Sequence, residues 1–430
     1  MSGRLWLGLY SLLMWLLQPW VIRKLKRRSR DEPLYGDHIP ERWGHYQVPA
    51  GEGFVWLHAV SLGETRVAAL LLPRLRARWP GVRLLLTHGT ATGRELGRTL
   101  LQPGDVQVWQ PWDTPQAVHR FLNHFRPRVG LLMETEVWPN WVQACQLRGM
   151  PLVLVNARMS ELSLRKAQRL SVLSRGAYAG LTEVWAQTQA DARRLQTLGA
   201  RVSAVMGNLK FDVRVDDGLQ SAGLQARDAL ARPVVVLASS REGEEHAFLQ
   251  ALQQRPHLLT RARWLIVPRH PQRFEEVATI MQSAGLRVVR RSHFSHLSQA
   301  TAVWAAHDDA TLLLGDSLGE MGAYAALGQA TLMGGSFEPL GGQNLIEPLA
   351  YGSPVVVGPH TFNFAQATEE AVLAGVAVRV SDWDSGIDAA LALTQQSAQQ
   401  AETSQRCRAF VQSHAGAVQR SLDRLAVWMR

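Results

Sequence analysis

The chain has 430 residues and 46% of them are hydrophobic, so it is long and apolar enough to form two or three domains. Only two cysteines occur, Cys145 and Cys407, which argues against a disulfide framework or a thiolate zinc site and fits a reducing compartment. The net charge of +10 is unevenly spread, because arginine and lysine fill six of the eight positions 23–30.

The N-terminus predicts a membrane anchor. Residues 5–22 read LWLGLYSLLMWLLQPWVI and carry no charge, close to the roughly 20 apolar residues that span a bilayer. A cleaved signal peptide carries its basic residues before the apolar run, whereas here they follow it, so we expect a retained anchor with 23–30 on the cytoplasmic side. Gln18 and Pro19 leave a single-pass and a monotopic anchor both open. No DNA-binding motif follows, so we expect membrane lipids and not nucleic acid as partners.

Beyond the anchor, short apolar runs alternate with helical patterns, which predicts a parallel sheet covered on both faces. The strands expected in the first half are 54–58, 83–88, 106–110, 129–133, 152–156, 183–187 and 203–206. The helices expected between them include 64–79, 92–100, 115–125 and 191–198.

The same pattern restarts after a polar stretch, with strands expected at 233–239, 262–268, 286–290, 311–315, 331–334 and 354–358. The sequence therefore predicts an α/β protein with two Rossmann-like domains. The expected division is an anchor with its basic cluster at 1–30, a first domain at 31–210, a linker at 211–232, a second domain at 233–403, and a C-terminal helix within 404–430 that packs back on the first domain.

The letters SLGE occur twice, at 61–64 and at 317–320, each time after an expected strand and at an expected helix start. Doubly wound sheets bind ligands at the carboxyl ends of their strands, so we expect both copies to face one interdomain cleft. Glycine before glutamate is expected to allow a tight turn, and the helix dipole favours an ionised glutamate at the helix start. An isolated motif of this kind is more often a carboxylate that only stabilises its helix.

The second half carries further motifs at strand ends, namely VPRHPQR (267–273), MGGSF (333–337) and GGQNLIEP (341–348). Asn344 and Glu347 are three residues apart and are expected on one helix face. Glycines and helix starts at strand ends can cradle a phosphate with backbone N–H groups, so these motifs indicate a nucleotide site. Neither a Walker motif nor an initial GxGxxG is present, which disfavours ATPases and dinucleotide enzymes.

The first half adds METEVWPN (133–140), with Glu134 and Glu136, and GNLKFD (207–212), which places Lys210 at the expected domain boundary. Glu134 could instead be a structural carboxylate paired with an arginine. Metal-ligand spacings such as HExxH or paired DxD are absent from the sequence, so we expect no metal and no cofactor.

Taken together, these motifs closely resemble those of the bacterial 3-deoxy-D-manno-octulosonic acid (Kdo) transferases, over essentially the whole chain. The motifs that carry the resemblance are HAVSLGE, METEVWPN, NARMS, GNLKFD, VPRHPQR, GDSLGEM, GGSF, GGQNLIEP and GPHTFNF. The resemblance implies the two-domain glycosyltransferase B fold and transfer of Kdo from CMP-Kdo to a lipid A precursor of the lipid IVA type. It also implies a location on the cytoplasmic side of the inner membrane and an inverting mechanism.

The resemblance assigns roles to individual residues. Glu64 matches the proton acceptor, and Glu134 and Lys210 match the transition-state stabilisers. The residues that match the CMP-binding segments are Arg269, His270, Leu318, Gly319, Glu320, Asn344, Leu345, Ile346 and Glu347.

Chemistry of the residues agrees with these roles, because a carboxylate can take the acceptor proton and a lysine can stabilise a departing phosphate. Three alternatives stay open: a glycosyltransferase that uses a UDP-sugar, a nucleotide-sugar epimerase of the same fold, and a non-enzymatic membrane scaffold. An epimerase would need no membrane anchor.

Overall fold

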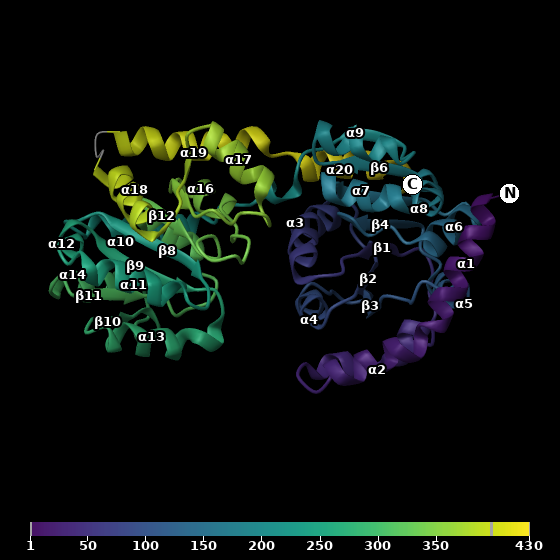
Figure 1. Cartoon of the computed structure of the whole chain (residues 1–430), viewed down its shortest axis with the longest axis horizontal. Coiled ribbons are helices and arrows are strands. Elements are labelled where there is room, and N and C mark those ends of the chain that lie inside the picture. The colour runs from purple at the N-terminus through teal and green to yellow at the C-terminus, as the bar shows by residue number, and fades with distance from the viewer. Residues whose placement is uncertain (1, 396–398, 430) are drawn as a thin grey trace. The chain divides into compact units, whose positions relative to one another are not determined.

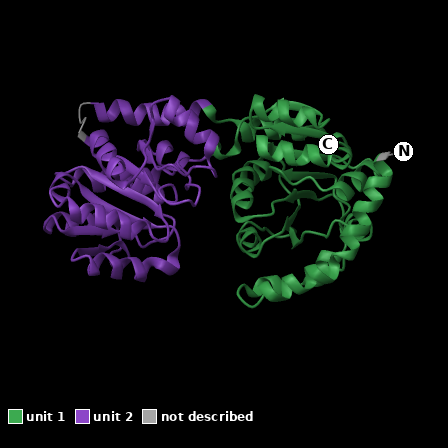
Figure 2. Ribbon diagram, viewed as in Figure 1, with its two compact units in different colours: residues 1–212, 414–430 green, residues 213–413 purple. Residues whose placement is uncertain are grey.

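The computed structural model describes residues 2–395 and 399–429. They divide into two compact units, shown in different colours in Figure 2. Unit 1 contains the chain up to Asp212 and again from His414, and unit 2 contains Val213–Ser413. The chain therefore crosses between the units twice.

Unit 1 contains a parallel sheet of seven strands within the described residues, in the order β3-β2-β1-β4-β5-β6-β7. The strands are β1 (Val55–His58), β2 (Leu84–His88), β3 (Val106–Trp109), β4 (Val129–Met133), β5 (Leu152–Ala157), β6 (Glu183–Ala186) and β7 (Val202–Val205). The helices of unit 1 beyond the N-terminus are α3 (Leu62–Arg78), α4 (Ala91–Thr99), α5 (Pro115–Phe125), α6 (Pro139–Leu147), α7 (Glu161–Arg169), α8 (Ser171–Ala179), α9 (Gln189–Thr197) and α20 (Ala417–Leu425). All seven strands expected from the sequence are confirmed to within one or two residues.

The sheet of unit 1 has a hydrophobic core on each face, because its strands are apolar at successive positions. Trp56 packs with Phe121 of α5 and Trp141 of α6 on one face. Leu57 lies on the other face in a cluster with residues of α3 and α20, including Leu422. Fully burying one such side chain contributes about 1.5–3 kcal/mol, so the paired layers fix the positions of the strand ends.

The anchor segment expected at 5–22 as one apolar run of spanning length is not a continuous helix, because it forms two helices, α1 (Ser2–Leu16) and α2 (Gln18–Arg28), bent by 45°. Pro19 lies in the first turn of α2 and cannot donate the N–H that would continue α1. Among the described residues no single helix is both long and apolar enough to cross a membrane, although this bent pair meets the length and composition criteria together.

Unit 2 repeats the architecture, with a parallel sheet of seven strands in the described residues, in the order β10-β11-β9-β8-β12-β13-β14 (Figure 1). The strands are β8 (Val234–Ser240), β9 (Arg263–Pro268), β10 (Arg287–Arg290), β11 (Thr311–Leu314), β12 (Ala330–Met333), β13 (Val355–Val357) and β14 (Ala377–Arg379). The helices are α10 (Asp217–Asp228), α11 (Glu244–Gln254), α12 (Leu258–Arg261), α13 (Phe274–Ser283), α14 (Leu297–Ala306), α15 (Met321–Leu327), α16 (Ile346–Ala350), α17 (Ala365–Leu373), α18 (Trp383–Gln395) and α19 (Gln400–His414). Strand β14 was not expected from the sequence, since it is a three-residue edge strand with two exposed residues.

The expected linker at 211–232 is wrong, because it contains α10, which packs within unit 2. A Cβ added at Gly223 of α10 would lie 2.3 Å from the carbonyl oxygen of Ala323 in α15, so the glycine permits close helix packing. Asp216 caps α10 by accepting from the Leu219 N–H at 2.9 Å. The polar composition of 211–232 thus reflects the exposed face of a helix.

The single helix expected near 404–429 is also broken. It forms α19 and α20, separated by Gly416 with φ +95°. Asp212 accepts from the Gly416 and Val418 N–H groups at 3.0 Å each, which fixes the start of α20. Helix α20 packs against unit 1, where Val418 and Leu422 are buried.

Candidate active site

Glu64 lies in the first turn of α3, directly after β1. Ser61 is the N-cap residue, and its hydroxyl accepts from the Glu64 N–H at 3.3 Å. The Glu64 carboxylate accepts from the Val60 N–H at 2.6 Å and from the Ser61 hydroxyl at 3.2 Å. The expected tight turn at Gly63 is wrong, since this glycine lies within the helix and does not have a positive φ.

The carboxyl group of Glu64 has an unusually high pKa for a glutamate. Burial raises the pKa, the negative charges of Glu136 and Glu134 raise it further, and the bonds from Val60 and Ser61 lower it, with a result of about 7. A carboxyl group with a pKa near neutrality can both accept and release a proton at physiological pH.

Glu134 follows β4 in a strained conformation. Its φ is +56°, in the left-handed region, which costs a non-glycine residue roughly 1–3 kcal/mol. Its side chain is buried and accepts from Arg158 Nε at 2.7 Å, while its N–H donates to the Val155 carbonyl at 3.0 Å. The pairing with an arginine that the sequence left open is therefore present. This ion pair does not exclude a role of Glu134 in catalysis, because the Arg158 side chain remains 52% exposed.

Lys210 lies in the short 3-10 helix Leu209–Asp212 after β7. The helix is held by Asn156, whose side-chain oxygen accepts from the Leu209 N–H at 3.0 Å. Burial lowers the pKa of Lys210, the charge of Glu134 opposes this, Arg158 lowers it further, and Glu64 raises it. The charges of Glu64 and Glu134 thus act on the Lys210 ammonium group within unit 1.

Sequence reasoning did not assign a role to His58 and Glu136, which belong to the same group. His58 is fully buried, its Nδ1 lies 2.8 Å from the Thr87 hydroxyl, and its Nε2 lies 3.9 Å from Glu136 Oε2. Glu136 also accepts from Trp138 Nε1 at 3.0 Å. His58 is the first letter of HAVSLGE and the last residue of β1. A histidine at the end of the strand that precedes Glu64 was therefore the signal in the sequence.

In unit 2, two glycine loops are joined into one structure. The Gly342 N–H donates to the Gly335 carbonyl at 2.6 Å, and the Gln343 N–H donates to the Gly334 carbonyl at 3.1 Å. Positive φ values at Gly335 and Gly342 allow this close approach. The motifs MGGSF and GGQNLIEP therefore form a single backbone surface after β12.

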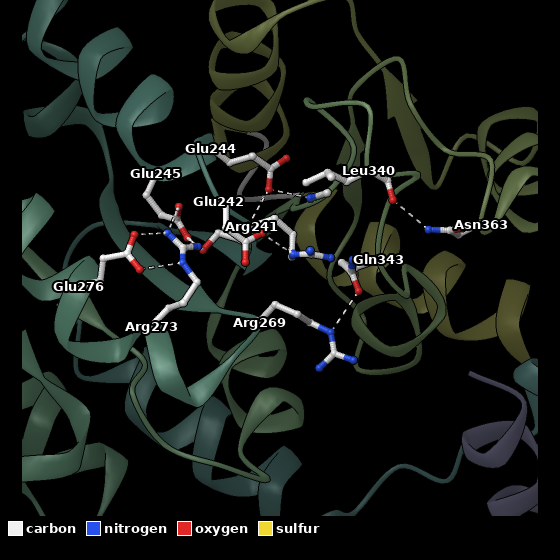
Figure 3. Close-up of polar contacts among 12 residues, drawn as sticks. Arg241, Glu242, Glu244, Glu245, Arg269, Arg273, Glu276, Leu340, Gln343 and Asn363 are labelled. Carbon is white, nitrogen blue, oxygen red and sulfur yellow. Dashed lines mark hydrogen bonds and ion pairs between the residues drawn. The ribbon is translucent and has the colours of Figure 1, made fainter. Parts of the chain in front are cut away.

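A buried glutamate that the sequence analysis missed holds this surface (Figure 3). Glu244 accepts from the N–H groups of Gly335 at 2.6 Å, Arg241 at 2.9 Å and Phe337 at 3.3 Å. Burial raises the pKa of Glu244, and these three bonds lower it. In the sequence, the signal for this role was the pair Glu244 and Glu245 in SREGEE (240–245), directly after β8.

Arg269 follows β9 and connects to the glycine loops. Its Nε donates to Gln343 Oε1 at 3.1 Å, as Figure 3 shows. His270 is the N-cap residue of the 3-10 helix Pro271–Arg273. By contrast Arg273, from the same motif, is buried and bonded to Glu245 at 2.7 and 3.1 Å, so its guanidinium serves the packing of unit 2.

The second SLGE copy differs from the first. Gly319 has φ +79° and makes the tight turn expected there, and Glu320 is the N-cap residue of α15. Its carboxylate accepts from Arg291 Nη2 at 2.6 Å and also bonds to the hydroxyls of Ser317 and Tyr324. Leu318 is 74% exposed. The carboxylate therefore holds the turn that presents Leu318 and Gly319.

The expectation that Asn344 and Glu347 share one helix face is wrong, because α16 begins at Ile346. Asn344 precedes the helix, and its side-chain oxygen accepts from the Ile346 N–H at 3.2 Å. The side chains of Leu345 and Ile346 are buried, so only their backbone is available to a ligand.

Each unit thus carries its candidate site residues after the carboxyl ends of its strands. In unit 1 Glu64 and Glu134 follow β1 and β4, the neighbours at which the strand order reverses, and Lys210 follows the edge strand β7. In unit 2 they follow β9, β11 and β12. Ligands of doubly wound sheets bind at this edge and at this reversal point. Two parallel α/β units of this kind resemble the domains of two-domain glycosyltransferases with the B-type fold.

Comparison with known proteins identifies the family within this class. A family model described as 3-deoxy-D-manno-octulosonic-acid transferase (kdotransferase) matches residues 37–213. The 3-deoxy-D-manno-octulosonic acid transferase of Bordetella pertussis is 44% identical over 98% of this chain and 99% of its own length. That of Haemophilus influenzae is 31% identical, with 84% of each chain covered. The chain belongs to the 3-deoxy-D-manno-octulosonic acid transferase family, glycosyltransferases of lipopolysaccharide biosynthesis.

The fold agrees with a solved structure of low sequence similarity. A glycosyltransferase from Rickettsia africae matches with a TM-score of 0.53 at 11% identity, over 88% of this chain and 99% of that chain. At this identity the match supports the fold only.

Proposed function

We propose that the protein transfers Kdo from CMP-Kdo to a lipid A precursor of the lipid IVA type, with inversion at the anomeric carbon and Glu64 as base. The observation that carries this proposal is the half-buried Glu64 carboxyl group after the carboxyl end of β1, which accepts from the Val60 N–H at 2.6 Å and has a pKa of about 7. The membership of the family supplies the transferred sugar.

In the proposed reaction, a hydroxyl of the acceptor attacks the anomeric carbon of Kdo. The new carbon–oxygen bond forms as the bond to the CMP phosphate breaks, and the hydroxyl proton passes to Glu64. A positioned base typically contributes about 10²–10⁴-fold to such a step. The single displacement with a single base accounts for inversion.

Glu134 and Lys210 are proposed to stabilise the charges that develop in this step. The anomeric carbon gains positive charge as the phosphate leaves, and the buried Glu134 carboxylate offers negative charge nearby. Lys210 offers positive charge for the leaving phosphate or for the carboxylate of the sugar. The depressed pKa of Lys210 reflects burial, where electrostatic interactions are stronger than in water.

Unit 2 is proposed to bind the CMP moiety, and unit 1 the acceptor. The joined glycine loops offer backbone N–H groups to a phosphate, and Arg269, held by Gln343, adds a positive charge. We assign His270, the turn 318–320 and the segment 344–347 to the same nucleotide site. Because Leu345 and Ile346 are buried, they would act through their backbone.

Helices α1 and α2 are proposed to bind the cytoplasmic side of the inner membrane as a monotopic anchor. Six of the exposed large apolar residues of α1 follow helical spacing along one face, namely Leu5, Trp6, Leu9, Leu12, Leu13 and Leu16, and the exposed Trp15 lies beside them. The opposite face contacts unit 1 through hydrogen bonds, for example from Trp112 Nε1 to the Met14 carbonyl at 2.9 Å. A helix docked along one face is suited to lying in one leaflet, and the basic residues of α2 can contact anionic headgroups.

The proposal is tested with purified protein, CMP-Kdo and a tetraacylated lipid A precursor, with mass spectrometry of the products. A mass increase of one or more Kdo residues is expected. Isothermal titration with CMP and with UDP distinguishes the alternative of a UDP-sugar donor, for which UDP would bind more tightly. Absence of any Kdo adduct under conditions where CMP binds would contradict the proposed acceptor.

A further inference from the structure

Helix α1 is hydrogen-bonded to two buried side chains of unit 1. The carboxylate of Asp113, which is 2% exposed, accepts from the Tyr10 hydroxyl at 2.9 Å. The Ser11 hydroxyl lies 2.9 Å from the side-chain oxygen of Asn140, which is 3% exposed. Two successive residues of α1, on the face opposite its exposed leucines, therefore contact buried polar groups.

The same two buried residues build the start of α6. Asp113 accepts from the Asn140 N–H at 3.2 Å and from the Trp141 N–H at 3.1 Å, and the Asn140 side-chain amide donates to the Asp113 carbonyl at 2.7 Å. The N-cap residue of α6, Trp138, provides no side-chain acceptor. Asp113, which precedes α5, thus caps α6 from a distant part of the chain, where the helix dipole favours a negative charge.

Helix α6 follows directly on the loop 134–138, which carries two carboxylates of the candidate site. The loop is fixed at its β4 end by the bond from the Glu134 N–H to the Val155 carbonyl. At its other end it is fixed by the start of α6, and so by Asp113. Five residues between two fixed ends leave little freedom, so a shift of the start of α6 displaces Glu134 and Glu136.

We propose that Asp113 and Asn140 are positioning residues that hold the loop 134–138 in a fixed position relative to α1. The docking of α1 on unit 1 would thereby control turnover. The inference rests on the proposed function of Glu134 in catalysis. The helix that binds the membrane would then also set the placement of the catalytic loop. Catalysis would be fastest when α1 is seated on unit 1.

The test is the double variant Tyr10→Phe/Ser11→Ala in the full-length protein. It removes both hydroxyls of α1 and leaves Asp113, Asn140 and the exposed apolar face unchanged. We expect kcat to fall about three- to tenfold, which does not exceed the net contribution of the two lost hydrogen bonds. The KM for CMP-Kdo and the binding to vesicles of phosphatidylethanolamine and phosphatidylglycerol should stay within twofold of wild type. Amide hydrogen exchange at Asn140 and Trp141 should become faster.

Tyr46→Phe is the matched control. The Tyr46 hydroxyl also lies inside unit 1, but it has no hydrogen-bond partner among the described residues. The control should keep wild-type kcat and wild-type exchange at residues 140 and 141.

The proposal is overturned if the double variant keeps wild-type kcat, or if its activity falls only in proportion to its vesicle binding. Unchanged exchange at residues 140 and 141 would also contradict it. If wild-type protein transfers no Kdo at all, the proposed function fails, whereas the exchange measurement still reports whether α1 holds α6.

Discussion

Glu134 and Arg158 form an ion pair in which the buried carboxylate accepts from Nε at 2.7 Å and the guanidinium stays half-exposed. Glu134 holds a left-handed backbone conformation at the same time. The pair therefore combines an unfavourable backbone conformation with a charge that needs a partner. Arg158 supplies that partner from the segment after β5, so it should determine how well Glu134 is placed for catalysis.

Replacing Arg158 by alanine should lower kcat about tenfold and reduce the free energy of unfolding by about 1 kcal/mol, because it leaves a buried acceptor without its partner. Steady-state kinetics and urea unfolding measure the two effects. Arg78→Ala is the control, since Arg78 pairs with the exposed Asp423 and should contribute less than about 0.5 kcal/mol. Equal effects of the two substitutions would show that Arg158 is only a surface residue.

The pKa of Glu64 predicts the pH dependence of activity. A base must be ionised, so kcat/KM should rise between about pH 6 and pH 8 with a midpoint near the pKa of about 7. A glutamate with the ordinary value of 4.5 would give a flat profile in this range. A profile of kcat/KM that is flat down to pH 5 would contradict the assignment.

Because of the same raised pKa, the ionised Glu64 carboxylate destabilises the folded state at high pH. The folded pKa lies above the unfolded value, so the folded state holds the proton more tightly and its stability falls as pH rises from about 4.5 to about 7. Glu64→Gln should therefore be more stable than wild type at pH 8, and the difference should vanish below pH 4.5. Thermal unfolding at pH 8 and pH 4 compares the two proteins.

Lys210→Ala should lower turnover by roughly 10²–10³, the range for one lost transition-state donor. Because burial lowers the pKa of this lysine, its removal should not reduce the melting temperature. Lys166→Ala removes an exposed lysine of the same unit and serves as the control. Turnover of the Lys210 variant within threefold of the control would assign Lys210 a structural role.

Glu320→Gln should weaken CMP binding by about tenfold, or about 1.4 kcal/mol, because the turn at 317–320 loses the carboxylate that Arg291 holds. Some turnover should remain at saturating donor. Glu242→Gln changes an exposed glutamate of the same unit and should leave CMP affinity unchanged. The comparison is made by calorimetric titration with CMP, and unchanged affinity in the Glu320 variant would separate this turn from the nucleotide site.

Much of the fold could be predicted from the sequence, because strands buried on both faces read as continuous apolar runs. The break between α1 and α2 could not, since hydropathy over 5–22 does not register the bend at Pro19. Helix α10 appeared as a linker because one face is polar and the other uses small residues such as Gly223 to pack closely. Edge strand β14 is too short and too exposed to give an apolar run.

The candidate site was predictable where a motif carries the chemistry, as for Glu64, and not where long-range contacts do. Asp113 accepts from backbone N–H groups of a distant segment, and nothing in its local sequence indicates these partners. For Glu244 the glutamate pair after β8 was a signal, but it does not indicate the distant partner Gly335. The two SLGE copies show the same limit, since identical letters form a first helical turn at Glu64 and a helix cap at Glu320.

The central claim is that Glu64 is the base and takes no part in holding the nucleotide, and Glu64→Gln tests it most directly. The variant keeps the shape of the side chain and removes its ability to take a proton. Transfer of Kdo should fall by about 10²–10⁴-fold, while CMP affinity, measured by titration, stays within twofold of wild type. Transfer at the wild-type rate, or a loss of CMP affinity that parallels the loss of transfer, would contradict the account.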